Sequence, residues 1–316
     1  MSYVSGSEGP SVSGFDVQGP SVLPDDAFIQ KWPITGSVNL VGDDFMQITS
    51  ISGSGAPIAF ASGSTDTFHR IAPPFIPGLI PGLKVWNLDP RVPGVEVPVH
   101  DALHTSPWLF DNATGAVARL NNDADFDEGC ITMADGGSSG NQIALYTDAT
   151  PFRCAGGRQW WAETEFKADD HDLYEFFFGI SEQVPTTDSL HLVAAAAGKD
   201  RVGFVKGVHS NDAVTFAASK NGGGTITTAL DSAIAYDTDA DVLNLGIHWD
   251  GIDSIRFYGS IRATGVKRPA LTLLHTYSTA AGISDDANMH LVLFHENGSA
   301  AARTTTISFI RGAIWT

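Results

Sequence analysis

The stretch that decides the fold is Trp160-Trp-Ala-Glu-Thr-Glu-Phe-Lys167, in which the character of the side chains alternates. One face collects Trp160, Ala162, Thr164 and Phe166, and the other collects Trp161, Glu163, Glu165 and Lys167. Successive side chains of a β-strand point to opposite faces, so this period of two predicts a strand that buries one face in a core. The face with two carboxylates and a lysine is predicted to be solvated.

The same pattern extends toward the C-terminus. Beyond Ser106, β-prone runs of about five to nine residues alternate with Gly, Asp and Asn turns, which is the spacing of a β-sandwich. The further predicted strands are 173–180, 201–205, 213–217, 225–228, 243–249, 254–258, 290–295 and 306–310. Only residues 189–197 have a helical composition, and they fit a loop equally well. We therefore predict an all-β fold.

The predicted architecture is an antiparallel jelly-roll sandwich over residues 106–316, preceded by an extended arm and a small β region over residues 1–105. The sandwich core is predicted to contain Trp160, Phe166, Phe176, Phe178, Phe204, Leu245, Ile247, Trp249, Phe257, Leu293 and Phe309.

The composition and charge of the chain narrow the classes of molecule that it is expected to bind. The chain has 316 residues, a formal net charge of -18 and a charged share of 17%, with 33 Gly and 16 Pro. The negative charge repels phosphate backbones and anionic headgroups, which makes nucleic acid and membranes poor partners. No apolar run approaches the roughly 18 to 20 residues needed to span a bilayer, and the N-terminus shows no export signal. We expect a protein that is made in a cytoplasm.

The N-terminal region differs from the rest. Its first thirty residues are rich in Gly, Ser and Pro, and Gly-Pro-Ser-Val occurs at both 9–12 and 19–22. Such a segment cannot bury enough apolar surface to fold alone, so it is either a tail or an arm that orders against a neighbouring subunit. Short β-prone runs then predict a small antiparallel sheet, and they are 28–32, 37–41, 45–51 and 58–61.

A proline-dense stretch, 72–99, follows, with Ile-Pro-Gly-Leu at 76–79 and again at 80–83. Proline removes a ladder donor and fixes φ, so we predict an extended connector or a second arm. Its apolar residues either cover one edge of this chain's own sandwich or bind a partner. The predicted partner-binding residues of the N-terminal region are Phe15, Phe28, Trp32, Phe75 and Trp86.

Several segments of the sandwich have a familiar order. They are Glu163–Lys167, Glu175–Glu182 with its Phe-Phe-Phe-Gly-Ile-Ser-Glu, Asp200–Phe204 with Val-Gly-Phe, Leu245–Gly251 with Leu-Gly-Ile-His-Trp-Asp-Gly, and Ile255–Tyr258. This succession over residues 159–316 resembles the laminin-G or concanavalin A-like jelly rolls of tailed-bacteriophage virion proteins. The resemblance implies a capsid decoration or cement protein, or an appendage protein, with the jelly roll as a rigid body and the N-terminal segment as the adaptor.

The sequence gives little support for a catalytic site. The sequence contains no phosphate-binding loop, no zinc-protease motif and no nucleophile elbow. Glu163 and Glu165 lie on one face of one strand, as do the carboxylates of some concanavalin-fold glycosidases. Those families carry a longer Glu-x-Asp-x-x-Glu signature, which is not matched here, and Lys167 stands two residues after Glu165. We predict no catalytic residues and no enzymatic activity.

Metal binding has little support as well. The acidic runs 123–128 and 237–241 alternate carboxylates, yet their spacing does not match a calcium loop, and we interpret them as polar turns. His290 and His295 point to opposite faces of one strand and are interpreted as ordinary strand residues. Cys130 and Cys154 are predicted to be free, partly buried thiols. We expect no metal and no cofactor.

The leading functional hypothesis is a decoration protein on the virion capsid surface that binds the major capsid protein and copies of itself as a homotrimer, because capsid shells offer local threefold axes. One alternative is a carbohydrate-binding tail or receptor-recognition protein, and a glycan ligand stays open. The second alternative is a glycosidase.

Overall fold

The computed structural model divides the chain into two compact units, Met1–Pro74 and Phe75–Thr316, which are described separately. The structure describes residues 48–50, 59–60, 68, 72–73, 75, 80, 82–90, 107–112, 116–121, 126, 129–182, 200–206, 214–220, 223–229, 234, 236, 238–263, 270–278 and 287–315. Among these residues, none belongs to a helix long and apolar enough to cross a membrane.

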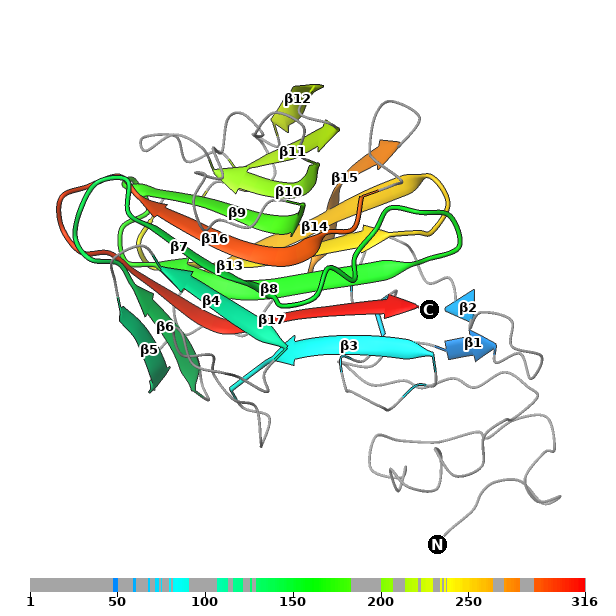
Figure 1. Ribbon diagram of the computed structural model, residues 1–316, viewed down its shortest axis with the longest axis horizontal. Helices are drawn as coiled ribbons and strands as arrows, with labels where there is room; N and C mark the ends of the chain where they lie inside the picture. Colours follow the sequence, from blue (N-terminus) through cyan, green and yellow to red (C-terminus); the bar gives the residue numbers. More distant parts are fainter. Residues whose placement is uncertain are drawn as a thin grey trace, which may run out of the picture. The chain divides into compact units, whose positions relative to one another are not determined.

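The larger unit is built from two antiparallel sheets (Figure 1). The first sheet orders its strands β12-β11-β10-β9-β16-β7-β4. Their bounds are β4 Trp108–Asn112, β7 Gln142–Thr147, β9 Tyr174–Ser181, β10 Arg201–Lys206, β11 Thr215–Lys220, β12 Gly223–Ala229 and β16 His290–Asn297.

The second sheet orders its strands β15-β14-β13-β8-β17-β6-β5, and β3 pairs with β17 beside this path. Their bounds are β3 Leu83–Leu88, β5 Ala116–Asn121, β6 Cys130–Ala134, β8 Trp160–Ala168, β13 Asp241–Trp249, β14 Ser254–Ala263, β15 Thr272–Ser278 and β17 Thr304–Trp315. Two stacked antiparallel sheets confirm the predicted all-β sandwich of the jelly-roll type.

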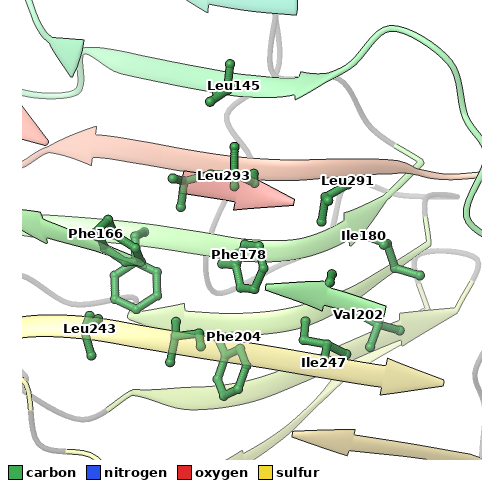
Figure 2. Close-up of a cluster of buried hydrophobic side chains, with 14 of the residues drawn as sticks. Leu145, Phe166, Phe178, Ile180, Val202, Phe204, Leu243, Ile247, Leu291 and Leu293 are labelled. Atoms are coloured by element: carbon green, nitrogen blue, oxygen red, sulfur yellow. The ribbon is translucent and has the colours of Figure 1, made fainter. Parts of the chain in front are cut away.

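The core lies between the sheets, where the inward faces of the strands meet (Figure 2). Phe166, Leu243 and Ile247 from the second sheet face Phe178, Phe204 and Leu293 from the first, and all are fully buried. The rings of Phe204 and Phe257 meet edge to face at 5.2 Å, which is a favoured aromatic geometry. The alternation of side chains from Trp160 to Lys167 therefore predicted the inward face of β8 correctly.

The structure confirms the nine predicted strands of the sandwich in position, each with ends shifted by a few residues. It adds strands that the sequence analysis did not predict, namely β3, β4, β5, β6, β7 and β15. The helical alternative at 189–197 lies outside the described residues.

One core assignment is wrong in orientation. Phe309 is fully buried, but it pairs with Glu165 and therefore lies on the outer face of the second sheet. The register of β17 against β8 shifts between Ile307 and Phe309. This irregularity reverses the alternation along β17, so that Ile310 and not Phe309 points into the core.

The smaller unit contains a two-stranded antiparallel sheet, formed by β1 Ile48–Ser50 and β2 Ala59–Phe60. These strands confirm the predicted small sheet for the runs 45–51 and 58–61. The runs 28–32 and 37–41 lie outside the described residues, as does the Gly-Pro-Ser-Val repeat.

β3 lies within the stretch that was expected to be a connector. The larger unit begins at Phe75, about thirty residues before the boundary expected at residue 105. Leu83–Leu88 pair with Trp315–Ile310, so this part of the proline-dense stretch belongs to the sandwich. Proline is absent from β3 itself, which allows the strand to donate its backbone N–H groups.

Two glycines allow the central strands of the first sheet to approach closely. Gly179 of β9 pairs directly with Gly203 of β10. A Cβ atom on Gly179 would lie 2.2 Å from the Val202 carbonyl oxygen and 2.5 Å from Gly203 Cα. Both obstacles are backbone atoms, which cannot move aside without disturbing the ladder.

We expect Gly179→Ala to lower the free energy of unfolding by about 2 kcal/mol or more, because an added methyl group must push two paired strands apart. Gly156→Ala is the matched control, since the nearest atom to its Cβ is the Gly251 carbonyl oxygen at 4.0 Å. Urea denaturation of both variants measures the difference. Equal stability of the two variants would contradict the close packing.

Candidate functional site

The outer face of the second sheet carries a buried ion pair between β8 and β17. Glu163 pairs in register with Arg311, and its Oε2 accepts hydrogen bonds from Arg311 Nε at 2.9 Å and Nη2 at 2.6 Å. The guanidinium lies between two rings, with Phe309 at 4.4 Å and Phe75 at 4.6 Å. Charge, hydrogen bonds and cation–π contacts thus fix Arg311 in one position.

A second ion pair lies two residues further along β8. Glu165 Oε1 accepts a hydrogen bond from Arg262 Nε of β14 at 3.0 Å. The Arg262 guanidinium lies over the Phe126 ring at 5.5 Å. Phe126 also packs with Cys130 and Val242 in a small apolar cluster on this face. Each carboxylate of β8 therefore has its own arginine and an aromatic ring nearby.

A stacked pair of rings continues this face. Trp161 and His248 face each other in register, with ring centroids 5.2 Å apart and planes 12° from parallel. Arg256 Nη1 lies 3.4 Å from His248 Nδ1. Burial, together with the Arg256 charge, lowers the pKa of His248 to about 3, so this imidazole is neutral at pH 7.

These contacts correct one prediction about β8. Glu163 and Glu165 were expected on a solvated face, but their exposed fractions are 0% and 2%. The reason is that Phe75 and Phe126 lie against the arginines that pair with them. A retaining glycosidase needs one carboxyl group that releases a proton and one that attacks, in contact with a sugar. Two buried carboxylates that are each paired with an arginine do not meet that requirement.

A polar network lies inside the sandwich, which the sequence analysis did not single out. His295 Nδ1 lies 2.5 Å from Thr305 Oγ1, which is hydrogen-bonded to the Tyr174 hydroxyl at 3.1 Å. The His295 Nε2 atom faces Asp135 Oδ2 at 3.7 Å, and both side chains are fully buried. Burial lowers the pKa of His295 to about 3.

Asp135, His295 and Thr305 are the residue types of a nucleophilic triad, but their surroundings give them a structural role. The Asp135 to His295 distance is beyond hydrogen-bond range, and all three residues are at most 5% exposed. Asp135 Oδ1 accepts hydrogen bonds from the backbone N–H groups of Gly137 and Arg303. This network joins β9, β16 and β17 at the end of the core.

The outer face of the first sheet is apolar at its centre and acidic at one end. Its apolar cluster consists of Ala144, Tyr146, Phe177, Val205, Ala217, Val292 and Phe294. Beside it, Glu175 of β9 stands directly opposite Glu296 of β16, which accepts a hydrogen bond from Gln142 Nε2 at 2.9 Å. Burial, and then the charge of Glu296, raises the pKa of Glu175 to about 7.

The predicted partner-binding residues are placed as follows. Phe75 is buried against Arg311, and its carbonyl oxygen accepts a hydrogen bond from Asn87 Nδ2 at 3.1 Å. Trp86 is half-buried and meets Phe152 at 5.5 Å between ring centroids. Both residues therefore contact this chain's own sandwich. Phe15, Phe28 and Trp32 lie outside the described residues, and partner binding at all five positions stays a prediction.

The acidic run 237–241 is paired with a histidine, and it does not form a metal site with other described residues. In the run 237–241, Asp239 accepts hydrogen bonds from His171 N at 2.9 Å and pairs with His171 Nδ1 at 2.8 Å. Within the part of the chain that the structure describes, no group of three or more His, Cys, Asp or Glu residues is arranged to hold a metal ion. Cys130 and Cys154 are not joined by a disulfide, as predicted, but both are fully and not partly buried, Cys154 in the core between the sheets and Cys130 in the cluster on the outer face of the second sheet.

Neither protein-family models nor the sequences of characterised proteins gave a match. A protein of unknown function from Shewanella oneidensis MR-1 is similar in structure, with 13% identity, 73% of this chain and 86% of that chain covered, and a TM-score of 0.46.

Two further structures have similar values. Arcelin-5, a lectin-like defence protein from Phaseolus vulgaris, shows 10% identity, 73% and 98% coverage and a TM-score of 0.45. An endo-1,3-β-glucanase from Streptomyces sioyaensis shows 10% identity, 76% and 99% coverage and a TM-score of 0.43. At such scores, the functional argument rests on this chain's own residues.

We expect Glu163→Gln to lower the free energy of unfolding by about 3 kcal/mol, because it leaves the Arg311 charge without its buried partner. The double variant Glu163→Gln/Arg311→Met removes both charges and should be clearly more stable than Glu163→Gln alone. Chemical denaturation of the four members of the cycle measures the coupling. A single variant as stable as the wild type would contradict a buried ion pair.

Glu175 should make stability depend on pH. Its pKa is raised from 4.5 in the unfolded chain to about 7 in the folded protein, so its protonated form stabilises the fold and this contribution is lost as pH rises from 4.5 through 7. Glu175→Gln should raise the urea midpoint at pH 8 and change it little at pH 4. Asp148→Asn, which removes the carboxylate of an exposed residue, serves as the matched control.

Proposed function

We propose that this chain is a structural protein of a tailed-bacteriophage virion that acts by binding, with the sandwich as its rigid body. The proposal places it on the capsid surface as a decoration or cement protein. Its partners would be the major capsid protein and further copies of itself.

One observation supports a non-catalytic role, namely that the carboxylates of Glu163 and Glu165 are engaged in ion pairs. They are the two carboxylates of the sandwich that the sequence offered for glycoside chemistry, and each is buried and paired with an arginine. An acid–base pair must reach its substrate and have separate proton affinities. Because these groups serve ion pairs within the sheet, the geometry favours a scaffold over an enzyme.

The virion part is supported by the resemblance of residues 159–316 to phage jelly rolls and by the composition of the N-terminal region. A folded sandwich satisfies its own backbone hydrogen bonds, whereas a Gly- and Pro-rich segment does not. Such a segment gains ordered contacts only on a partner, which favours large contact areas. We therefore assign attachment to the N-terminal region.

The test uses the full chain with Phe15→Ser, Phe28→Ser and Trp32→Ser combined. We expect this variant to lose binding to phage heads that lack the protein, by at least ten-fold, while its thermal unfolding stays as in the wild type. Ile252→Ser is the matched control, because Ile252 is a sandwich residue with an exposed fraction of 77%. Cosedimentation with purified heads measures both.

Two outcomes would contradict the proposal. If the triple variant binds heads as well as the wild type does, attachment belongs to the sandwich. If the wild type hydrolyses polysaccharides and Glu163→Gln or Glu165→Gln abolishes the turnover, the chain is a glycosidase. Saturable binding to host glycans without turnover would favour the receptor-recognition alternative.

A further inference from the structure

We propose that β3 is an exchangeable strand, which can pair either with β17 of its own chain or with β17 of a second copy. The exchange would link copies of this protein into oligomers. This inference concerns the chain alone and does not depend on its location in a virion.

The first observation is the position of β3 in the sheet. Leu83–Leu88 pair with Ile310–Trp315 and, among the strands that the structure describes, with no other, as Figure 1 shows at the outer side of the C-terminal strand. On its other side, β17 pairs with β8 over Thr305–Ile314. β17 is thus held in the sheet without β3, while β3 has one backbone partner. Removing β3 would leave the last six residues of β17 as an open strand edge.

The second observation is that this edge must be filled. A Cβ on Gly312 would lie 2.7 Å from Phe152 Cζ, so the Phe152 ring packs directly over this glycine. Trp86, which pairs with Gly312, covers the same ring from the side of β3. Leu88 is fully buried in the main core. The sandwich therefore needs these side chains, but any copy of the chain can supply them.

The third observation is the sequence on either side of β3. Prolines 73, 74, 77 and 81 precede the strand, and prolines 90, 93, 98 and 107 lie between it and β4. Proline fixes φ and biases the residue before it toward extended conformations. The nineteen residues 89–107 reach at most about 60 Å when extended. That length is enough to cross to a neighbouring molecule.

Exchange costs little in contacts. A swapped β3 makes the same pairing with β17, the same Trp86 to Phe152 contact and the same Phe75 to Arg311 contact as the strand in its own chain. The balance is therefore set by protein concentration, by the conformation of the connection and by the repulsion between copies with a net charge of -18. Because salt screens that repulsion, the oligomeric fraction should rise with ionic strength.

The experiment places one cysteine on each strand of the pair in the full chain, as Val85→Cys and Ala313→Cys, since these residues stand directly opposite each other. Directly opposed residues of an antiparallel pair are close enough for a disulfide. Tagged Val85→Cys chains and untagged Ala313→Cys chains are coexpressed, oxidised and separated by non-reducing electrophoresis. A disulfide between the two chains is favoured when β3 of one chain pairs with β17 of the other, because the two new cysteines then stand opposite each other.

We expect a reducible heterodimer that contains one chain of each kind. The control replaces Ala313→Cys by Thr272→Cys, because Thr272 is exposed on β15, which pairs with β14 and not with β3. This control should give at least ten-fold less heterodimer. Equal amounts from both combinations would indicate random collision and overturn the proposal, as would the absence of a heterodimer.

A second measurement applies if either cysteine variant fails to fold. Wild-type chain and isotope-labelled wild-type chain are mixed at high salt and examined by native mass spectrometry. Mixed oligomers that dissociate on dilution are expected, and strictly monomeric protein at every concentration would overturn the exchange. Failure of head binding in the separate test above would leave these results unchanged, so the two proposals are distinguishable.

Discussion

Backbone pairing along β17 is the constraint on which the larger unit depends. This strand, Thr304–Trp315, is held by β8 along one edge, and by β6 and β3 along the other. The sheet is thus completed only when β17 meets β3, which precedes it by more than two hundred residues. Non-local pairing of this kind is slow to form, so the sandwich is a structure that closes late.

Polar groups are used in the sandwich to fix geometry. The ion pairs of Glu163 and Glu165 connect β8 with β17 and β14, strands that are distant in sequence and near in the sheet. Buried charges contribute little net stability unless both partners are present, but they penalise any register that separates them. A one-residue slip of β17 would reverse its faces and bring Arg311 into the core. The ion pairs therefore specify the register of β17 more strictly than the alternation of apolar residues does alone.

Local alternation was sufficient to predict the fold class, the inward face of β8 and most of the core. It could not predict that Glu163 is buried, because the burial depends on Phe75 and Phe126 from remote segments. It also misplaced Phe309, since a bulge reverses the alternation without a mark in the sequence. β3 was missed because surrounding prolines concealed six residues that are free of proline. Contacts at long range decided each of these cases.

The thiols of Cys130 and Cys154 can be used to follow local opening of the sandwich by chemical labelling. Cys154 belongs to the core between the sheets, whereas Cys130 lies with Phe126 and Val242 on the outer face of the second sheet. Burial raises the pKa of the Cys154 thiol far above its ordinary value, so a reagent must wait for an opening that both exposes and ionises it. The labelling rate of Cys154 would thus report separation of the two sheets, and the labelling rate of Cys130 would report opening of the apolar cluster on the outer face.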